Sequence, residues 1–401
     1  MTPPITTDGP RATEALDYRT AEGLPAHDAG AAGPPSPAEQ RAERVDWLAT
    51  LVGLVSLVAV AGVVLAVLAF SNSDDDSAPA GRAAAPAAAA ADAPAPTLAE
   101  SRGVAFEKFQ EVDPTLPPVP AGKVKKFDVD VYQHVTQVSE KLAPTEVWSY
   151  AVNGKKFSGT GVSAPMVVTE GDLVDFKLTN GSTDAMKVDL PHSLDFHSAE
   201  VDPGRRYADL APGESMSYRF VAKHPGVFMY HCATQPVLLH TGAGMVGMFV
   251  VKPKDLAPVD KELWLTQQEF YIGRPGGDAD LDKMSAKKPD VIAFNGFADQ
   301  YKANPISVRK GEKVRMYVLN AGPSIWSAFH VIGTVFDKTV IEGTAGHDAQ
   351  TVNLAPSQGG WVEFTLDEEG TFPFVTHAFG DMVKGALGVL KTPGAPKGHG
   401  H

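Results

Sequence analysis

One short stretch of the sequence carries three side chains that bind soft metal ions. Cys232 is the only cysteine of the chain, and His240 and Met245 follow it after eight and a further five residues. A thiolate, a weak axial thioether and two imidazoles are the ligands of blue-copper electron-transfer sites. One strand and the loop after it can present all three side chains to one ion, so the spacing predicts such a site. The alternative is a buried free cysteine with unrelated neighbours, and the ordered spacing argues against it.

A second histidine-rich stretch, upstream, supplies the missing imidazole. Neighbouring residues of a strand point to opposite faces of the sheet. His192 and His197 are five positions apart, and His231 directly precedes Cys232. If both stretches are extended, His192 and Cys232 share an interior thiolate site, and His197 and His231 face the other way. These last two form an incomplete site, because a catalytic metal commonly has three protein ligands and one open position.

An internal repeat indicates where the third imidazole lies. The motif from Val168 to Asn180 recurs from Val308 to Asn320, and that from Leu210 to Gly226 recurs from Leu354 to Gly370. The segments alternate apolar and polar residues between Gly, Pro and Asn turns, which is typical of β-sandwiches. The repeat therefore predicts two homologous β-sandwich domains.

The second copy lacks the thiolate, because Thr376 stands where Cys232 stands in the first. This domain cannot hold a blue copper of its own. It offers His330, His347 and His377. His377 lies in the counterpart of the stretch around Cys232 and is the best third ligand. His347 lies in a loop, and we interpret it as a structural histidine.

The net charge and one apolar run indicate which partners and which cellular location to expect. The 401 residues carry a net charge of −13, which argues against a nucleic-acid partner. Residues Trp47 to Phe70 form an uncharged apolar run, preceded by Arg41 and Arg44 and followed by three aspartates. That run is long enough to span a bilayer as a helix, and its flanking charges place the N-terminus in the cytoplasm. We expect an uncleaved single-pass anchor in the cell membrane, with the domains outside the cytoplasm, rather than a signal peptide.

The expected organisation follows. It consists of a disordered cytoplasmic tail (1–45), a transmembrane helix (46–71), an Ala/Pro-rich linker (72–100), a first domain (101–255), a second domain (256–395) and a short disordered tail (396–401).

Four segments of the chain together resemble the copper-containing nitrite reductases: HSLDFH, MYHCATQPVLLHTGAGM, SAFHVIGTVFDKTVIEG and FVTHAFGDMVKGALGVLK. The resemblance covers about residues 127–393. It implies an all-β fold of two tandem Greek-key cupredoxin barrels, a homotrimer, and the shorter of the family's loops between Cys232 and His240.

The resemblance also implies roles for individual residues. The type 1 copper is expected on His192, Cys232, His240 and Met245, and the type 2 copper on His197 and His231 of one subunit and His377 of its neighbour. Asp195 and His330 match the family's acid–base pair. Ile332 matches an apolar residue that caps the copper.

The implied activity is the one-electron reduction of nitrite to nitric oxide and water. The peptide unit between His231 and Cys232 is a short covalent route for the electron. Asp195 would hydrogen-bond nitrite and deliver one proton, and His330 would supply the other through water. There is no Cys-x-x-Cys-His haem motif, so the electron donor must be a separate cupredoxin, cytochrome or membrane component. The segment after His197 lacks the glycine-rich run expected of the family, and we expect the surroundings of the site to differ there.

Two other functions compete with this one. A laccase-like multicopper oxidase needs several His-x-His pairs and a histidine after the thiolate, yet Ala233 follows Cys232. A membrane-tethered blue-copper electron carrier would need neither Asp195 nor His330 nor His377. The copper content per chain distinguishes a two-copper enzyme from both alternatives.

Overall fold

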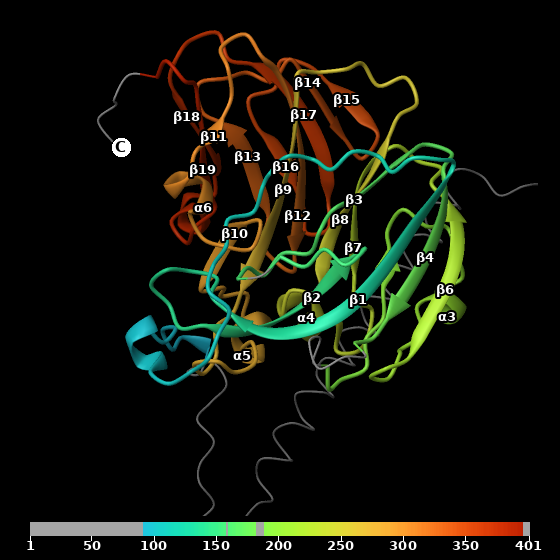
Figure 1. Ribbon diagram of the computed structural model, residues 1–401. Helices are drawn as coiled ribbons and strands as arrows, with labels where there is room; N and C mark the ends of the chain where they lie inside the picture. Colours follow the sequence, from blue (N-terminus) through green and yellow to red (C-terminus); the bar gives the residue numbers. More distant parts are fainter. Residues whose placement is uncertain (1–90, 158, 182–187, 396–401) are drawn as a thin grey trace, which may run out of the picture. The chain divides into compact units, whose positions relative to one another are not determined.

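The computed structural model describes residues 91–157, 159–181 and 188–395 (Figure 1). These residues form four β-sheets with a few short helices, which confirms the predicted all-β class. The predicted tails (1–45 and 396–401), the transmembrane helix (46–71) and the linker as far as residue 90 lie outside the described residues. Within the described part of the chain, no helix is long and apolar enough to cross a membrane.

The first half is a sandwich of two four-stranded sheets, with strand orders β2-β1-β4-β6 and β3-β8-β7-β5. Aromatic residues from both sheets, among them Phe176 of β4 and Phe249 of β8, meet in one core. The strands are β1 (Val124–Thr136), β2 (Thr145–Val152), β3 (Met166–Thr169), β4 (Leu173–Thr179), β5 (Asp195–Phe196), β6 (Ser215–Val221), β7 (Gly226–His231) and β8 (Val246–Lys252).

The second half is a sandwich of a six-stranded sheet, β10-β9-β12-β17-β14-β15, and a five-stranded sheet, β11-β19-β18-β13-β16. The strands are β9 (Lys261–Phe270), β10 (Val291–Phe294), β11 (Ile306–Ser307), β12 (Lys313–Gly322), β13 (Ser327–Val331), β14 (Lys338–Ile341), β15 (Thr344–Gly346), β16 (Val352–Leu354), β17 (Gly359–Thr365), β18 (Thr371–Thr376) and β19 (Leu387–Lys391).

The second sandwich repeats the strand order of the first. The order β10-β9-β12-β17 corresponds to β2-β1-β4-β6, and β11-β19-β18-β13 corresponds to β3-β8-β7-β5. The parallel pairings recur as well, since β1 pairs with β4 and β9 pairs with β12 in parallel. Strands β14, β15 and β16 are additions of the second half. The topology thus shows the duplication that the sequence repeat predicts.

One short helix precedes β1, and the others lie in the connections between strands. They are η1 (Leu98–Ser101), α3 (Pro203–Arg206), α4 (Val237–Gly242), α5 (Leu281–Ser285), α6 (Gln300–Ala303) and α7 (Phe379–Met382). Two of them lie beside residues singled out by the sequence. Helix α4 carries His240, and α3 lies in the segment after His197, where the Asp202 side chain accepts a hydrogen bond from the Gly204 amide at 3.1 Å.

A segment before β1 lies against both sandwiches (Figure 1). Thr97 forms a bridge with Leu142, so the contacts of the β-structure begin within the predicted linker. The rings of Phe109 and Phe297 stack with centroids 3.8 Å apart, and the Tyr301 hydroxyl donates to the Val112 carbonyl at 3.0 Å. The segment therefore fastens the first half to the second.

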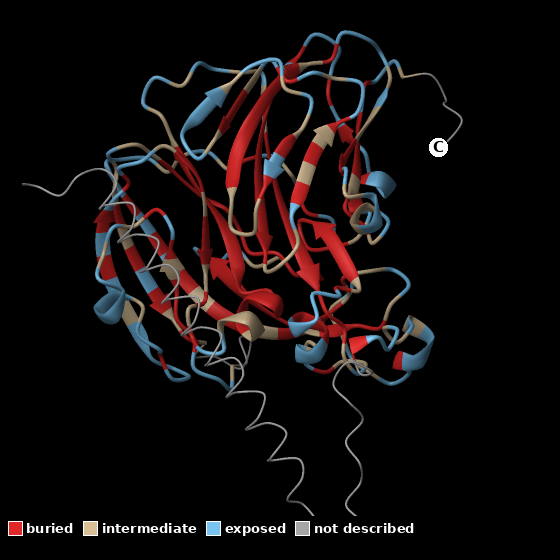
Figure 2. Cartoon of the chain, turned by 180° about the vertical axis from the view of Figure 1, so that it is seen from behind, coloured by how far each residue is buried: buried red, intermediate tan, exposed pale blue. Residues whose placement is uncertain are grey.

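One sheet of the first half is buried on both of its faces. Tyr230 of β7 and Phe249 of β8 pack into the first core, whereas Met229 and Met248 pack with Trp264 of the second half. Figure 2 shows buried residues in red along these inner strands, with exposed residues in pale blue mainly in loops and short helices. The direction of a β7 side chain therefore decides which of two environments it enters.

The second half contains a buried cluster of charges. Arg315 of β12 donates to Glu363 Oε1 from Nε at 2.9 Å and from Nη2 at 2.7 Å, and to Glu262 Oε1 at 3.2 Å. Lys313 Nζ lies 3.3 Å from the other Glu363 oxygen. Removing one partner of a buried ion pair leaves an uncompensated charge, which costs more than losing an exposed pair.

Replacing Glu363 with Leu should therefore lower the free energy of unfolding by about 3–5 kcal/mol, because Arg315 loses its main partner inside the sheet. Urea unfolding followed by tryptophan fluorescence measures the change. The matched control is Asp175→Leu, which removes the partner of the exposed Arg219 of the edge strand β6 and should cost much less. Equal losses in the free energy of unfolding for the two variants would show that burial does not determine how much the Arg315 cluster contributes to stability.

Candidate metal centres

The end of strand β7 sends adjacent residues into different surroundings. Cys232 belongs to the core of the first sandwich, together with Tyr230. His231 is opposite Asp195 in the pairing of β7 with β5 and has the same parity as Met229, which faces the second sandwich. The predicted alternation therefore holds on this strand, although β5 is only two residues long and His192 lies outside it.

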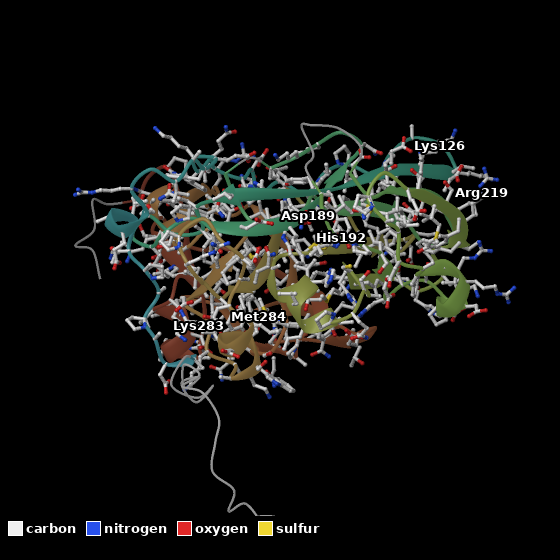
Figure 3. All side chains as sticks on the ribbon, turned by 90° about the horizontal axis from the view of Figure 1, so that it is seen from below. Lys126, Asp189, His192, Arg219, Lys283 and Met284 are labelled. Carbon is white, nitrogen blue, oxygen red and sulfur yellow. The ribbon has the colours of Figure 1, made fainter. Side chains whose placement is uncertain are left out.

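Three donor atoms converge in the first sandwich. The Nδ1 atoms of His192 and His240 are 3.0 Å apart, and Cys232 Sγ lies 3.3 Å from His240 Nδ1 and 3.9 Å from His192 Nδ1. All three residues are buried, and Figure 3 shows His192 among interior side chains, whereas Lys126 and Arg219 project at the periphery. Met245 is fully buried in the same core, and its carbonyl accepts from the Cys232 amide at 3.1 Å.

The electrostatics of this group favour a metal ion. Burial, and then repulsion from His240, lower the pKa of His192 to about 3, and burial also lowers the pKa of His240. Both imidazoles are thus neutral, the form that binds metals. His192 Nε2 is buried without a hydrogen-bond partner among the described residues. The polar contacts of this ring, with His240 and Cys232, are therefore made at Nδ1. Two nitrogens and a sulfur facing one another this closely fit copper as a shared cation.

A second group lies where β5 and β7 end. The Nε2 atoms of His197 and His231 are 3.1 Å apart, and Asp195 Oδ2 is 3.7 Å from His231 Nε2. His197 is the most exposed of the three. His231 Nδ1 lies 2.8 Å from the Cys232 carbonyl oxygen. That oxygen can only accept, so Nδ1 carries the proton and Nε2 is left free for a metal.

The predicted histidines of the second half form a separate pair. His330 of β13 and His377, which follows β18, stack with ring centroids 5.2 Å apart, and the His330 ring also bonds the Gln350 carbonyl. Burial lowers the pKa of His330, and His377 lowers it further. Neither residue belongs to the group of Asp195, His197 and His231 within one chain. The second group thus has two imidazoles and lacks the predicted third.

Exposed apolar side chains occur in contact with this histidine pair and near it in the sequence. Phe379 lies with its ring centroid 5.0 Å from that of His377 and is 55% exposed. Trp326, Ile332 and Val383 are exposed large hydrophobic residues of the same half, and Val383 is 75% exposed. Ile332 directly follows β13, two residues after His330. Clustered exposed apolar side chains commonly mark an interaction site.

A cavity of about 670 Å³ adjoins the second group. Asp195 and His197 line it together with Tyr207, from the segment after His197, and with Glu342 and Ser357 of the second half. Burial, and then the charge of Asp195, raise the pKa of Tyr207. The segment that departs from the expected glycine-rich pattern thus forms part of the cavity wall.

Sequence reasoning missed the polar residues around the thiolate. Ser193 and Thr234 are buried, and Thr234 Oγ1 lies 3.1 Å from Ser193 Oγ and 2.7 Å from Asp209 Oδ1. The signal available in the sequence was adjacency alone, because Ser193 follows His192 and Thr234 is two residues after Cys232. Asp209 lies in a loop far from either ligand in sequence, and no spacing rule points to it.

Comparison with known proteins finds copper proteins. Residues 128–255 match the family model described as multicopper oxidase. The chain is 38% identical over 250 residues to the copper-containing nitrite reductase of Neisseria gonorrhoeae, which covers 60% of this chain and 63% of the relative. The chain therefore spans less than two thirds of the length of that relative.

Solved structures show the same likeness. A copper nitrite reductase from Nitrosomonas europaea superposes with a TM-score of 0.61 and 28% identity, covering 69% of this chain and 98% of that one. A copper-containing nitrite reductase from Thermus scotoductus has a TM-score of 0.59 and 30% identity, covering 69% of this chain and 64% of that one.

The geometry makes a prediction about the two groups. Replacing Cys232 with Ser should abolish the visible thiolate-to-copper charge-transfer band and leave about one copper ion per chain, because the His197–His231 group keeps its donors. Replacing His231 with Ala should keep the band and lose the other ion. Absorption spectra with copper analysis measure both, and a Cys232→Ser variant that kept the band would contradict the first group.

Proposed function

The chain is a relative of the copper-containing nitrite reductases, and on that premise we propose that it reduces nitrite to nitric oxide and water. The observation that carries the proposal is the pair of donor groups joined by the single peptide unit between His231 and Cys232. A carrier needs only the thiolate group. An enzyme needs a second group that substrate can reach, and His197 lies on a cavity.

Each group would hold one copper ion. His192, Cys232, His240 and Met245 would hold the first, and His197 and His231 the second, together with His377 of the partner subunit. When bound, copper supplies the electron at the first group and a Lewis-acidic position for the substrate at the second. The His231–Cys232 peptide unit supplies the covalent connection between the groups.

The remaining chemistry falls to side chains beside the second group. The reaction consumes nitrite, one electron and two protons, and it yields nitric oxide and water. Asp195 is half-buried and 3.7 Å from His231 Nε2, so its carboxyl can hydrogen-bond nitrite and pass a proton to the oxygen that leaves as water. His330 would provide the second proton through water. This requires an assembly in which the surface that carries His330 in one subunit lies beside Asp195 of the next.

The incomplete second group supports an oligomer in which each site forms between two subunits, and the resemblance to the copper-containing nitrite reductases makes this oligomer a homotrimer. In one chain, His377 stacks on His330 away from His197 and His231. A catalytic metal commonly has three protein ligands, so a second copy that brings His377 to this group completes it. The exposed apolar residues around His377, including Phe379 and Val383, suit burial in such an interface.

The setting of the enzyme is part of the proposal. We place the two domains at residues 101–255 and 256–395, with His377 and His330 contributed by the second. The apolar run Trp47 to Phe70 would anchor the chain in the cell membrane with both domains outside the cytoplasm. To test the anchor, the protein should sediment with membranes, and detergent but not salt should release it.

An external cupredoxin, cytochrome or membrane component would deliver the electron.

Replacing Asp195 with Asn should leave both copper ions bound and lower nitrite turnover by about 10²-fold or more, because a positioned proton donor is lost. Anaerobic nitric oxide production with a reduced dye as donor measures the rate. The control is Asp202→Asn, on the exposed turn of the same loop, where Asn caps α3 as well as Asp does. No nitric oxide from the two-copper wild-type protein would overturn the proposed reaction, and an unchanged Asp195→Asn rate would exclude this carboxyl from it.

Mixed assemblies test the shared site. His231→Ala and His377→Ala chains should each be inactive alone, because each variant removes one ligand from all the His197–His231 groups of its assembly. Assembled together in equal amounts, they should recover about a quarter of wild-type activity, because one interface in four then pairs an intact His231 with an intact His377. Continued inactivity of well-formed mixed trimers would mean that the third ligand does not come from a neighbouring subunit.

A further inference from the structure

Two polar groups of Ser193 face the sulfur of Cys232. The Ser193 amide donates to Cys232 Sγ at 3.4 Å, and the Ser193 hydroxyl oxygen lies 3.8 Å from the same sulfur. Both residues are buried, and Ser193 directly follows the proposed ligand His192. Ser193 itself is not among the proposed copper ligands. What it contributes to the sulfur depends on the direction of its hydroxyl proton.

The backbone and the hydroxyl oxygen of Ser193 are both held in place. Its carbonyl accepts from the Tyr150 hydroxyl at 2.7 Å, so the proton of this neighbouring hydroxyl is already engaged. Its hydroxyl oxygen accepts from the Ala233 amide at 3.1 Å. Neither contact takes up the hydroxyl proton of Ser193. The side chain is therefore fixed beside the sulfur, and its proton remains to be donated.

Thr234 does not take up that proton either. Thr234 Oγ1 is the donor in its contacts with Asp209 Oδ1 at 2.7 Å and with Ser193 Oγ at 3.1 Å, and its one proton is shared between these two oxygens. A hydroxyl group has one proton and two lone pairs. Both lone pairs of Ser193 thus face donors, namely Thr234 and the Ala233 amide. Among the described neighbours of this hydroxyl, the acceptor left for its proton is Cys232 Sγ.

We propose that the Ser193 hydroxyl is a second hydrogen-bond donor to the Cys232 thiolate, beside the Ser193 amide, and that it raises the reduction potential of the copper bound there. A hydrogen bond draws electron density from the sulfur, so the thiolate stabilises the oxidised ion less. Ser193 acts through the sulfur and is therefore a positioning residue. The first copper then accepts an electron from an external donor more readily and passes it to the second group with less driving force. The inference rests on the proposed role of Cys232 as a copper ligand.

Ser193→Ala is the direct test, because it removes the hydroxyl and keeps the amide. In the copper-loaded protein, we expect the blue charge-transfer band to remain and the midpoint potential to fall. The expected change is about tenfold in the ratio of reduced to oxidised copper, which is about 59 mV for one electron. A redox titration followed by the blue absorbance measures it.

Thr234→Val tests the direction of the proton. Valine has nearly the shape of threonine but neither donates nor accepts. Because Thr234 donates to Ser193, its loss leaves the Ser193 proton on the sulfur, and the potential should change much less than in Ser193→Ala. In the Ser193→Ala background, Thr234→Val should cause no further fall. Thr241→Val is the matched control, since the Thr241 hydroxyl bonds the Val237 carbonyl at 2.8 Å within α4, and it should leave the potential unchanged.

The proton itself can also be observed. In oxidised protein equilibrated with D2O, pulsed electron–nuclear double resonance should show a deuteron coupled to the copper–thiolate spin that Ser193→Ala loses and Thr234→Val keeps. This measurement separates donation to the sulfur from a movement of the loop, because Ser193→Ala also leaves the Ala233 amide without its acceptor.

Two results would overturn the inference. An unchanged potential in a blue Ser193→Ala protein, or retention of the coupled deuteron, would mean that the hydroxyl does not donate to the sulfur. A rise in potential in Thr234→Val would mean that the Ser193 proton points to Thr234 in the wild-type protein. A colourless copper-loaded wild-type protein would overturn the ligand assignment as well. A blue protein that behaves as expected but makes no nitric oxide would overturn only the proposed reaction.

Discussion

The alternation of side chains along β7 is the constraint on which the rest of the site depends. Two adjacent residues of an extended strand cannot point the same way. Cys232 therefore enters the first core while His231 leaves it, and two donor groups are separated by the thickness of one sheet but joined by one peptide unit. Any shift of register by one residue would exchange the two side chains and destroy both groups.

This constraint is useful only because the sheet has different surroundings on its two faces. On one face the thiolate group is sealed within the core, beside the Trp148 ring, which packs edge-on against His192 and His240 at centroid distances of 5.4 and 5.1 Å. A closed, rigid site suits electron transfer, because little around the ion needs to rearrange. On the other face, Asp195 and His197 of the second group line a cavity whose wall includes residues of both sandwiches.

The features of the site that follow from a periodic pattern could be predicted from the sequence. Strand parity separated Cys232 from His231, and the internal repeat anticipated the matching strand orders of the two sandwiches. Features that depend on folding of distant segments could not be anticipated. Asp209 reaches Thr234 through a loop, and the segment before β1 fastens both halves together through Phe109 and Phe297. Neither contact has a spacing that a periodic pattern could reveal.

The position of His377 explains why the second donor group cannot be understood from one chain. Its strand, β18, corresponds to β7 in the order of the sheets, and His377 lies one residue beyond the end of β18, whereas His231 is the last residue of β7. Thr376 stands in the place of the thiolate, and its hydroxyl cannot serve as the thiolate ligand that a second blue copper would need. What remains is an exposed histidine whose ring centroid lies 5.0 Å from that of the exposed Phe379. In the proposed assembly, this strand end would complete the second donor group of a neighbouring subunit.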